Sequence, residues 1–188
     1  MNRWVPLGCY GVLLGIGLAF MAHGLWIPAK AALAQHLLEN AWQNTRKDKK
    51  VAKPWPWADT WPIARLTIDG KSTIVLSDAG GESLAFGPSH VSGSAKPGTM
   101  GTSVISAHRD THFQVLKTVK PGNVFTLERA DGTEQDYEVL ETRILPNPEL
   151  SLPLEDGRDR LILVTCWPFD AVVPDPQKRI AVLAERIR

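Results

Sequence analysis

The sequence predicts an all-β domain, closed into a barrel or folded as a sandwich, that follows one N-terminal membrane helix. Three observations predict this architecture. Residues 4–28 carry no charged side chain, the chain beyond residue 62 is a series of short apolar runs, and turn residues rather than long helical patterns separate those runs. Short strands without alternating helices are typical of barrels and sandwiches.

The membrane helix is predicted from "WVPLGCYGVLLGIGLAFMAHGLWIP", residues 4–28. A spanning helix needs about 20 predominantly apolar residues, and Trp4 and Trp26 stand near the two ends, where indole rings prefer the interface. The apolar region of a cleaved signal peptide is normally only about 7–15 residues long. We therefore expect an uncleaved anchor over residues 1–28. Basic residues flank both of its ends, so charge alone leaves the topology open.

Residues 29–58 are predicted to form a helical and Pro/Trp-rich linker. Leu33, Leu37 and Trp42 fall at helical spacing, which indicates an amphipathic helix that continues the membrane helix or lies on the domain that follows. The prolines of "KPWPWADTWP" then disfavour helix. We expect the β-domain to occupy residues 59–188.

Seven apolar runs are strand candidates in the β-domain. In order they are "IARLTI", "TIVL", "TSVISA", "VFTLE", "QDYEVLETRI", "RLILVT" and "RIAVLA". The segments "IDGK", "KPGT", "KPGN" and "ADGT" supply turn residues between them. "VFTLERADGTEQDYEVLE" is the clearest hairpin, with its turn at Asp131-Gly132.

Composition excludes several functions. A formal net charge of +1 gives no electrostatic footprint for nucleic acid. The only two cysteines are Cys9, inside the membrane segment, and Cys166, so neither a disulfide scaffold nor a C-x-x-C redox motif is present in the sequence.

Cys166 ends the apolar run of "LILVTCWPFD". A lone cysteine after a strand is most often a small buried hydrophobe. Its place at a strand end favours a second interpretation, because rigid strands hold catalytic groups in the loops that they feed. A nucleophilic cysteine also needs a proton partner and a group that stabilises an oxyanion.

Two residues at other strand ends are suited to these needs. His108 follows directly after the apolar strand in "SVISAHRDTHF", whereas His90 and His112 are expected to be loop histidines. Arg179 opens the last strand, and a hairpin-like connection would bring it beside Cys166. Its guanidinium stays charged and donates several hydrogen bonds, although a surface ion pair is the usual role of a lone arginine.

Together these segments resemble the sortase family of membrane-anchored cysteine transpeptidases. "ILVTC" matches that family's T-L-x-T-C strand except at Ile162, and "ISAHRDTHF" is similar to its histidine segment, with Ala107 where glycine is commoner. The resemblance covers about residue 63 to the C-terminus. "LVTCWPFDA" looks most like the small sortases of Gram-negative bacteria.

The resemblance implies a closed β-barrel of about eight strands and a set of site residues. Cys166 would be the nucleophile, His108 the general acid/base and Arg179 the stabiliser of the oxyanion and substrate. Thr165 would support substrate binding. No acidic loop matches the calcium sites of some sortases, so we expect neither a metal nor another cofactor.

The implied reaction is cleavage of an LPXTG-like C-terminal sorting signal through a Cys166 thioester, followed by transfer to an amine acceptor. The partners would be the sorted protein, an acceptor such as a cell-envelope precursor, and the membrane. The domain would then face outside the cytoplasm, in the periplasm of a Gram-negative cell. Two alternatives stay open: a cysteine peptidase that only hydrolyses, and a non-catalytic membrane-tethered β-domain that binds peptide or glycan.

Overall fold

The computed structural model describes residues 7–146, 157–171 and 178–187. The predicted interfacial Trp4 and part of the proline-rich loop after Trp167 lie outside these residues. By its internal contacts the chain divides into two compact units, Met1–His36 and Leu37–Arg188.

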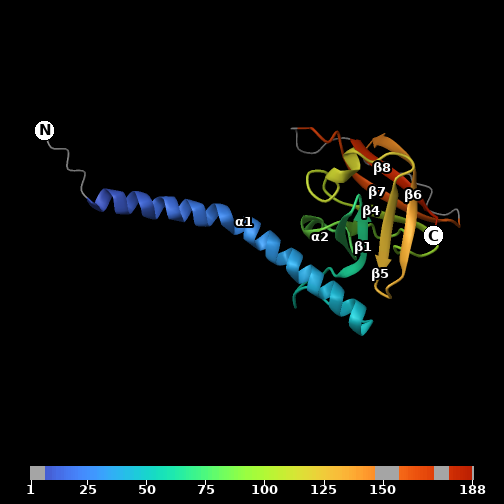
Figure 1. The fold of residues 1–188 in the computed structure, drawn as a ribbon, viewed down its shortest axis with the longest axis horizontal. Coiled ribbons are helices and arrows are strands. Elements are labelled where there is room, and N and C mark those ends of the chain that lie inside the picture. The colour runs from blue at the N-terminus through green and yellow to red at the C-terminus, as the bar shows by residue number, and fades with distance from the viewer. Residues whose placement is uncertain (1–6, 147–156, 172–177, 188) are drawn as a thin grey trace. The chain divides into compact units, whose positions relative to one another are not determined.

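A single helix, α1 (Leu7–Asp48), runs through the predicted anchor and into the predicted linker (Figure 1). Its apolar part is long enough to cross a membrane, and residues 10–33 are exposed. Pro28 lies inside the helix. The helix candidate beyond Pro28 therefore continues the predicted membrane helix, which is one of the two arrangements that the sequence left open.

The second unit contains a closed barrel of eight strands, as predicted. Their order around the barrel is β1-β2-β3-β4-β7-β8-β6-β5. The strands are β1 (Pro62–Ile68), β2 (Lys71–Leu76), β3 (Ser89–His90), β4 (Gly101–Ser106), β5 (Val124–Arg129), β6 (Glu134–Pro146), β7 (Asp159–Trp167) and β8 (Lys178–Arg186).

All seven apolar runs form strands, and the β5–β6 hairpin turns where it was predicted, with Gly132 at a φ of 89°. Two elements were not predicted from the sequence: β3 and the short helix α2 (Gly81–Phe86). Both are too short to produce a recognisable hydrophobic period. A 3-10 turn, η1 (Gln114–Lys117), follows β4.

Strand β7 is covered by side chains on both faces, which explains its unbroken apolar sequence. Leu161 and Leu163 belong to the main core inside the barrel. Ile162 and Val164 point the other way and pack in a second apolar cluster on the outer face, together with Val104 of β4 and Ala181 of β8. Alternation along the strand then places Cys166 on the same outer face as Ile162 and Val164.

The end of α1 packs within the barrel unit. Leu38 and Trp42, both almost wholly buried, contact Ile74 and Leu76 of β2. The guanidinium of Arg65 lies 6.0 Å from the centre of the Trp42 ring. The last turns of α1, which belong to the predicted helical linker, thus pack against the barrel. The predicted domain limits at residues 28 and 58 stay predictions.

Candidate active site

Cys166 is the next-to-last residue of β7 and is a free, half-buried cysteine. Its strand lies between β4, which is parallel to it, and β8, which is antiparallel. The sulfur therefore belongs to the central strand of three, at the edge of the buried apolar cluster on the outer face. Its neighbours within the sheet at this level are the ends of β4 and β8.

Arg179 is the partner on the β8 side. The register pairs it directly with Cys166. Directly opposed residues of an antiparallel pair have side chains on the same face and Cα atoms about 4.5–5.5 Å apart. Arg179 is half-buried, and its Nη1 donates a hydrogen bond to the Lys178 carbonyl over 3.2 Å. In this register Cys166 and Arg179 lie side by side, which is the placement expected from the sequence.

His108 is the neighbour on the β4 side. Ser106 pairs with Val164, and the Ala107 N–H donates to the Val164 carbonyl over 3.2 Å. His108 is two residues beyond Ser106, just as Cys166 is two residues beyond Val164. Because parallel strands lie about 4.8 Å apart, the histidine and the cysteine leave adjacent strands at the same level. His108 is exposed to solvent.

Thr165 connects the two strand ends from inside the barrel. It is 1% exposed, and its hydroxyl donates to the Ala107 carbonyl over 2.7 Å. This hydrogen bond therefore holds Ala107, which precedes His108, next to Thr165, which precedes Cys166.

We expect Thr165→Val to lower the free energy of unfolding by about 1–3 kcal/mol, because the change keeps the side-chain shape but leaves the buried Ala107 carbonyl without its donor. Urea unfolding of the full chain in detergent measures this. Thr118→Val is the matched control, since the exposed Thr118 hydroxyl also donates to a carbonyl, over 3.0 Å, and its loss should change stability little. Equal losses in the two variants would contradict this role for Thr165.

The other histidines of the barrel have separate surroundings. His112 is half-buried rather than a solvated loop residue, and its Nδ1 lies 3.4 Å from the Thr73 hydroxyl. Burial, and then the charge of His108, lower the pKa of His112, so it is neutral at pH 7. His90 is buried in β3, where its Nε2 lies 2.9 Å from the Ala95 carbonyl oxygen. In the described part of the chain, no group of three or more His, Cys, Asp or Glu side chains could hold a metal.

Arg109 is a site residue that the sequence analysis did not identify. It is 8% exposed, and its Nη1 and Nη2 donate to the carbonyls of Pro168 and Ala171 over 2.7 and 2.8 Å. Its Nε donates to Asp110 over 3.1 Å. One guanidinium thus ties the segment after His108 to the loop that begins just after Cys166. No sequence signal shows that a guanidinium bonds to backbone carbonyls 59 and 62 residues away.

We expect Arg109→Met to lower kcat by about 10–100-fold with a smaller change in KM, because the two segments lose their shared anchor and small displacements of reacting groups are costly. Arg109→Lys should recover part of the rate, and added guanidinium should partly rescue Arg109→Ala. Steady-state cleavage of a peptide substrate measures these effects.

Lys117→Met is the control for Arg109, since it removes another contact to the same loop, the exposed ion pair with Asp170 at 2.8 Å. Such a pair contributes little. The positioning role would be contradicted if the loss of kcat in Arg109→Met were no larger than the fraction of that variant found unfolded in thermal melts.

Comparison with known proteins places this barrel in a family. The Sortase domain family model matches residues 66–187. Sortase D of Bacillus subtilis (strain 168) is 31% identical over 114 residues, which is 60% of this chain and 57% of that protein. Sortase A from Corynebacterium diphtheriae has a TM-score of 0.62 and 26% identity, covering 70% of this chain and 63% of that one.

Two more solved structures extend the likeness. Sortase C-1 from Actinomyces oris has a TM-score of 0.60 at 28% identity and covers 68% of this chain and 75% of that one. The Clostridium perfringens Sortase D5 transpeptidase, at 17% identity, shares the fold, with a TM-score of 0.65 over 84% of this chain and 99% of that one.

The fold and the site define one class: a closed eight-stranded barrel with a cysteine at the end of β7, paired with an arginine on β8 and next to the strand β4, which a histidine follows two residues after its end. With the family model covering most of the barrel, the chain belongs to the sortase family. It spans 57% of the length of the curated relative and 63% of the Corynebacterium diphtheriae chain.

Proposed function

We propose that this protein is a membrane-anchored cysteine transpeptidase that cleaves an LPXTG-like C-terminal sorting signal and transfers the protein to an amine acceptor. One observation carries the proposal: Cys166 lies on the central strand, level with His108 on one side and paired with Arg179 on the other. A nucleophile, a proton carrier and a permanent cation are the three groups that acyl transfer through a thioester requires.

In the first half-reaction the Cys166 thiolate attacks the carbonyl carbon of the scissile peptide bond. A bond forms between Sγ and this carbon, and the carbonyl oxygen becomes an oxyanion that Arg179 stabilises by charge and hydrogen bonds. His108 gives a proton to the departing amine as the carbon–nitrogen bond breaks. The products are a thioester on Cys166 and the released C-terminal fragment.

In the second half-reaction an acceptor amine attacks the thioester carbon. His108, now neutral, takes the proton of the amine, and the carbon–sulfur bond breaks to release the new amide and restore the thiolate. Water in place of the amine would give a carboxylic acid instead. Transfer and hydrolysis therefore differ only in the second nucleophile.

On the outer face below Cys166, Val104, Ile162, Val164 and Ala181 form a buried apolar cluster. Close packing of these side chains holds the strand end that carries the nucleophile. The choice of an LPXTG-like signal as substrate therefore rests on the family and not on this cluster.

Mass spectrometry of the full chain incubated with an LPXTG-like peptide tests the proposal. The expected result is an acyl adduct on Cys166 and, with an added primary amine, an amide product in place of the acid. Arg179→Ala should lower the rate of adduct formation by about 10²–10³-fold. Peptide cleavage that persists after alkylation of Cys166 would contradict the proposed mechanism.

We further propose a single-pass protein with the N-terminus in the cytoplasm and the barrel outside it. The apolar part of α1 supports the single span. The site supports the orientation, since envelope proteins and their amine acceptors lie on the outer side. Protease added to intact spheroplasts should degrade the barrel. If the barrel resists the protease until the spheroplasts are lysed, the orientation is the opposite one.

A further inference from the structure

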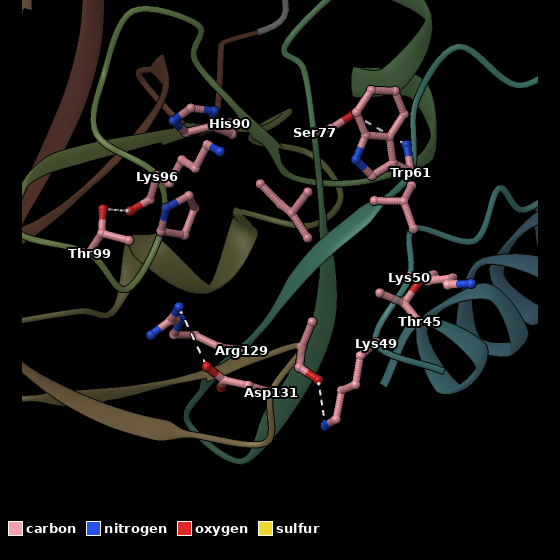
Figure 2. A pocket seen from close by; sticks show the side chains of 14 residues that line it. Thr45, Lys49, Lys50, Trp61, Ser77, His90, Lys96, Thr99, Arg129 and Asp131 are labelled. Atoms are coloured by element: carbon pink, nitrogen blue, oxygen red, sulfur yellow. Dashed lines mark hydrogen bonds and ion pairs between the residues drawn. The ribbon is translucent and has the colours of Figure 1, made fainter. Parts of the chain in front are cut away.

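A pocket of about 530 Å³ opens within the barrel unit, formed by several separate segments of sequence (Figure 2). They include the end of α1 with the residues after it, the start of β1, the loop that carries Lys96, and the end of β5 at Arg129 with the turn after it. Pockets that bind small molecules are typically about 300–1,000 Å³. The size therefore suits one small organic molecule.

This pocket is separate from the candidate active site. Its loop at Lys96, Pro97 and Thr99 comes before β4, whereas His108 comes after that strand. A six-residue strand separates its two ends by about 17 Å. A ligand in this pocket is thus not the peptide carbonyl that Cys166 would attack.

Positive charge is concentrated in the pocket. Lys49, Lys50, Lys96 and Arg129 line it, against the single carboxylate of Asp131. The whole chain has a net charge of only +1, so this excess is local. In the described residues Lys96 has no ion-pair partner. Basic side chains around one cavity favour an anionic ligand.

The Lys96 loop is held rigidly beside Arg129. Gly98 adopts a φ of +77°, and a Cβ there would lie 2.6 Å from the Arg129 Cδ. The Gly98 carbonyl accepts a hydrogen bond from the buried Gln135 side chain over 3.2 Å, and the Thr99 N–H closes the turn on Lys96 over 3.1 Å. The close approach needs a residue without a side chain, and it fixes the loop of Lys96 beside Arg129 at the end of β5.

The Arg129 guanidinium can exchange its present partner for a ligand. Its ion pair with Asp131 is 3.5 Å long, and the side chains are 36% and 49% exposed. Exposed pairs of this kind contribute about 0–1 kcal/mol. A phosphate or carboxylate that accepts two hydrogen bonds from the planar guanidinium competes well with such a contact.

The remaining lining is suited to an apolar body. In Figure 2, Lys96 and Arg129 lie on one side of the pocket and the Trp61 indole lies across from them. Ile63 and Pro97 also line the cavity. An aromatic side chain offers both apolar contact and a face on which a flat ring can stack.

We propose that this pocket binds a small organic anion, with its phosphate or carboxylate group at Lys96 and Arg129 and its apolar part against Trp61. Calorimetric titration of the full chain in nonionic detergent with phenyl phosphate tests this site, with inorganic phosphate, benzoate and phenol as comparison probes. Phenyl phosphate should bind more tightly than either inorganic phosphate or phenol. Benzoate binding more tightly than phenyl phosphate would assign a carboxylate rather than a phosphate, and either result supports the site.

Lys96→Gln, alone and combined with Arg129→Gln, should weaken binding by about tenfold or more, because each change removes a charge-assisted hydrogen bond. The control is Lys71→Gln with Arg143→Gln, which removes the same charge from exposed residues outside the pocket and should leave the affinity unchanged. The exposed Lys96 can be replaced without disturbing the core, so the single variant remains informative if the double variant unfolds.

Protein in which Cys166 has been alkylated beforehand should bind the probe equally well. This result would separate the pocket from the proposed catalytic function. No binding of phenyl phosphate or benzoate at millimolar concentration would overturn the proposal. So would an affinity that Lys96→Gln leaves unchanged, or phenyl phosphate and benzoate both binding no better than phenol.

Discussion

Cys166→Ala is expected to abolish both the acyl adduct and all cleavage of an LPXTG-like peptide, a loss of at least about 10⁴-fold. Removing a nucleophile eliminates the covalent route entirely, and comparable losses of about 10⁶-fold in kcat are known for a serine nucleophile. Intact-mass spectrometry of the full chain, quenched during turnover, measures the adduct, and chromatography of the released fragment measures cleavage.

Cys9→Ala is the matched control for this result. Cys9 is the only other cysteine of the sequence and lies within the range of α1 rather than the barrel. The variant should keep both the adduct and full activity. An adduct that disappears in Cys9→Ala, or cleavage that survives in Cys166→Ala, would show that Cys166 is not the nucleophile.

The second large effect is expected for His108→Gln, which should reduce acyl transfer from a peptide by about 10²–10⁴-fold, because the departing amine then lacks its proton donor. A substrate with a leaving group that needs no proton, such as an activated ester, should restore most of the acylation rate. Stopped-flow measurement of acylation with both substrates separates proton transfer from nucleophilic attack.

His112→Gln is the control for His108. His112 lies in the same loop, and its pKa is lowered first by burial and then by the charge of the nearby His108. A neutral, half-buried side chain should be replaceable with little effect on acylation at pH 7. Equal rate losses in the two variants, or a His108→Gln loss that is the same for peptide and ester, would contradict the acid role.

Much of the fold was predictable, because apolar runs and the turn residues between them determine where the strands of the barrel begin and end. The β5–β6 hairpin turns at the predicted glycine, and every predicted apolar run is a strand. β3 could not be predicted, since two residues, Ser89 and His90, contain no period. Its place in the sheet depends on pairing with strands distant in sequence.

The site was predictable only in part. Strand-end positions and the length of the connecting loop were sufficient to bring Cys166 and Arg179 together, whereas the roles of these residues stay predictions. Arg109 was missed because its function depends on where the Pro168 and Ala171 carbonyls point. The anion pocket was missed for a similar reason, because several segments distant in sequence must fold before their cationic residues share one cavity.

The position of β8 has a consequence for when the protein can become active. β8 pairs with β7 on one side and β6 on the other, so it is the element that seals the barrel, and it also carries Arg179. Until it docks, two long strands have unpaired edges that invite aggregation, and Cys166 has no opposing guanidinium. In the proposed mechanism Arg179 stabilises the oxyanion, so we expect a barrel in which β8 has not docked to be inactive, and the same docking event covers the exposed strand edges.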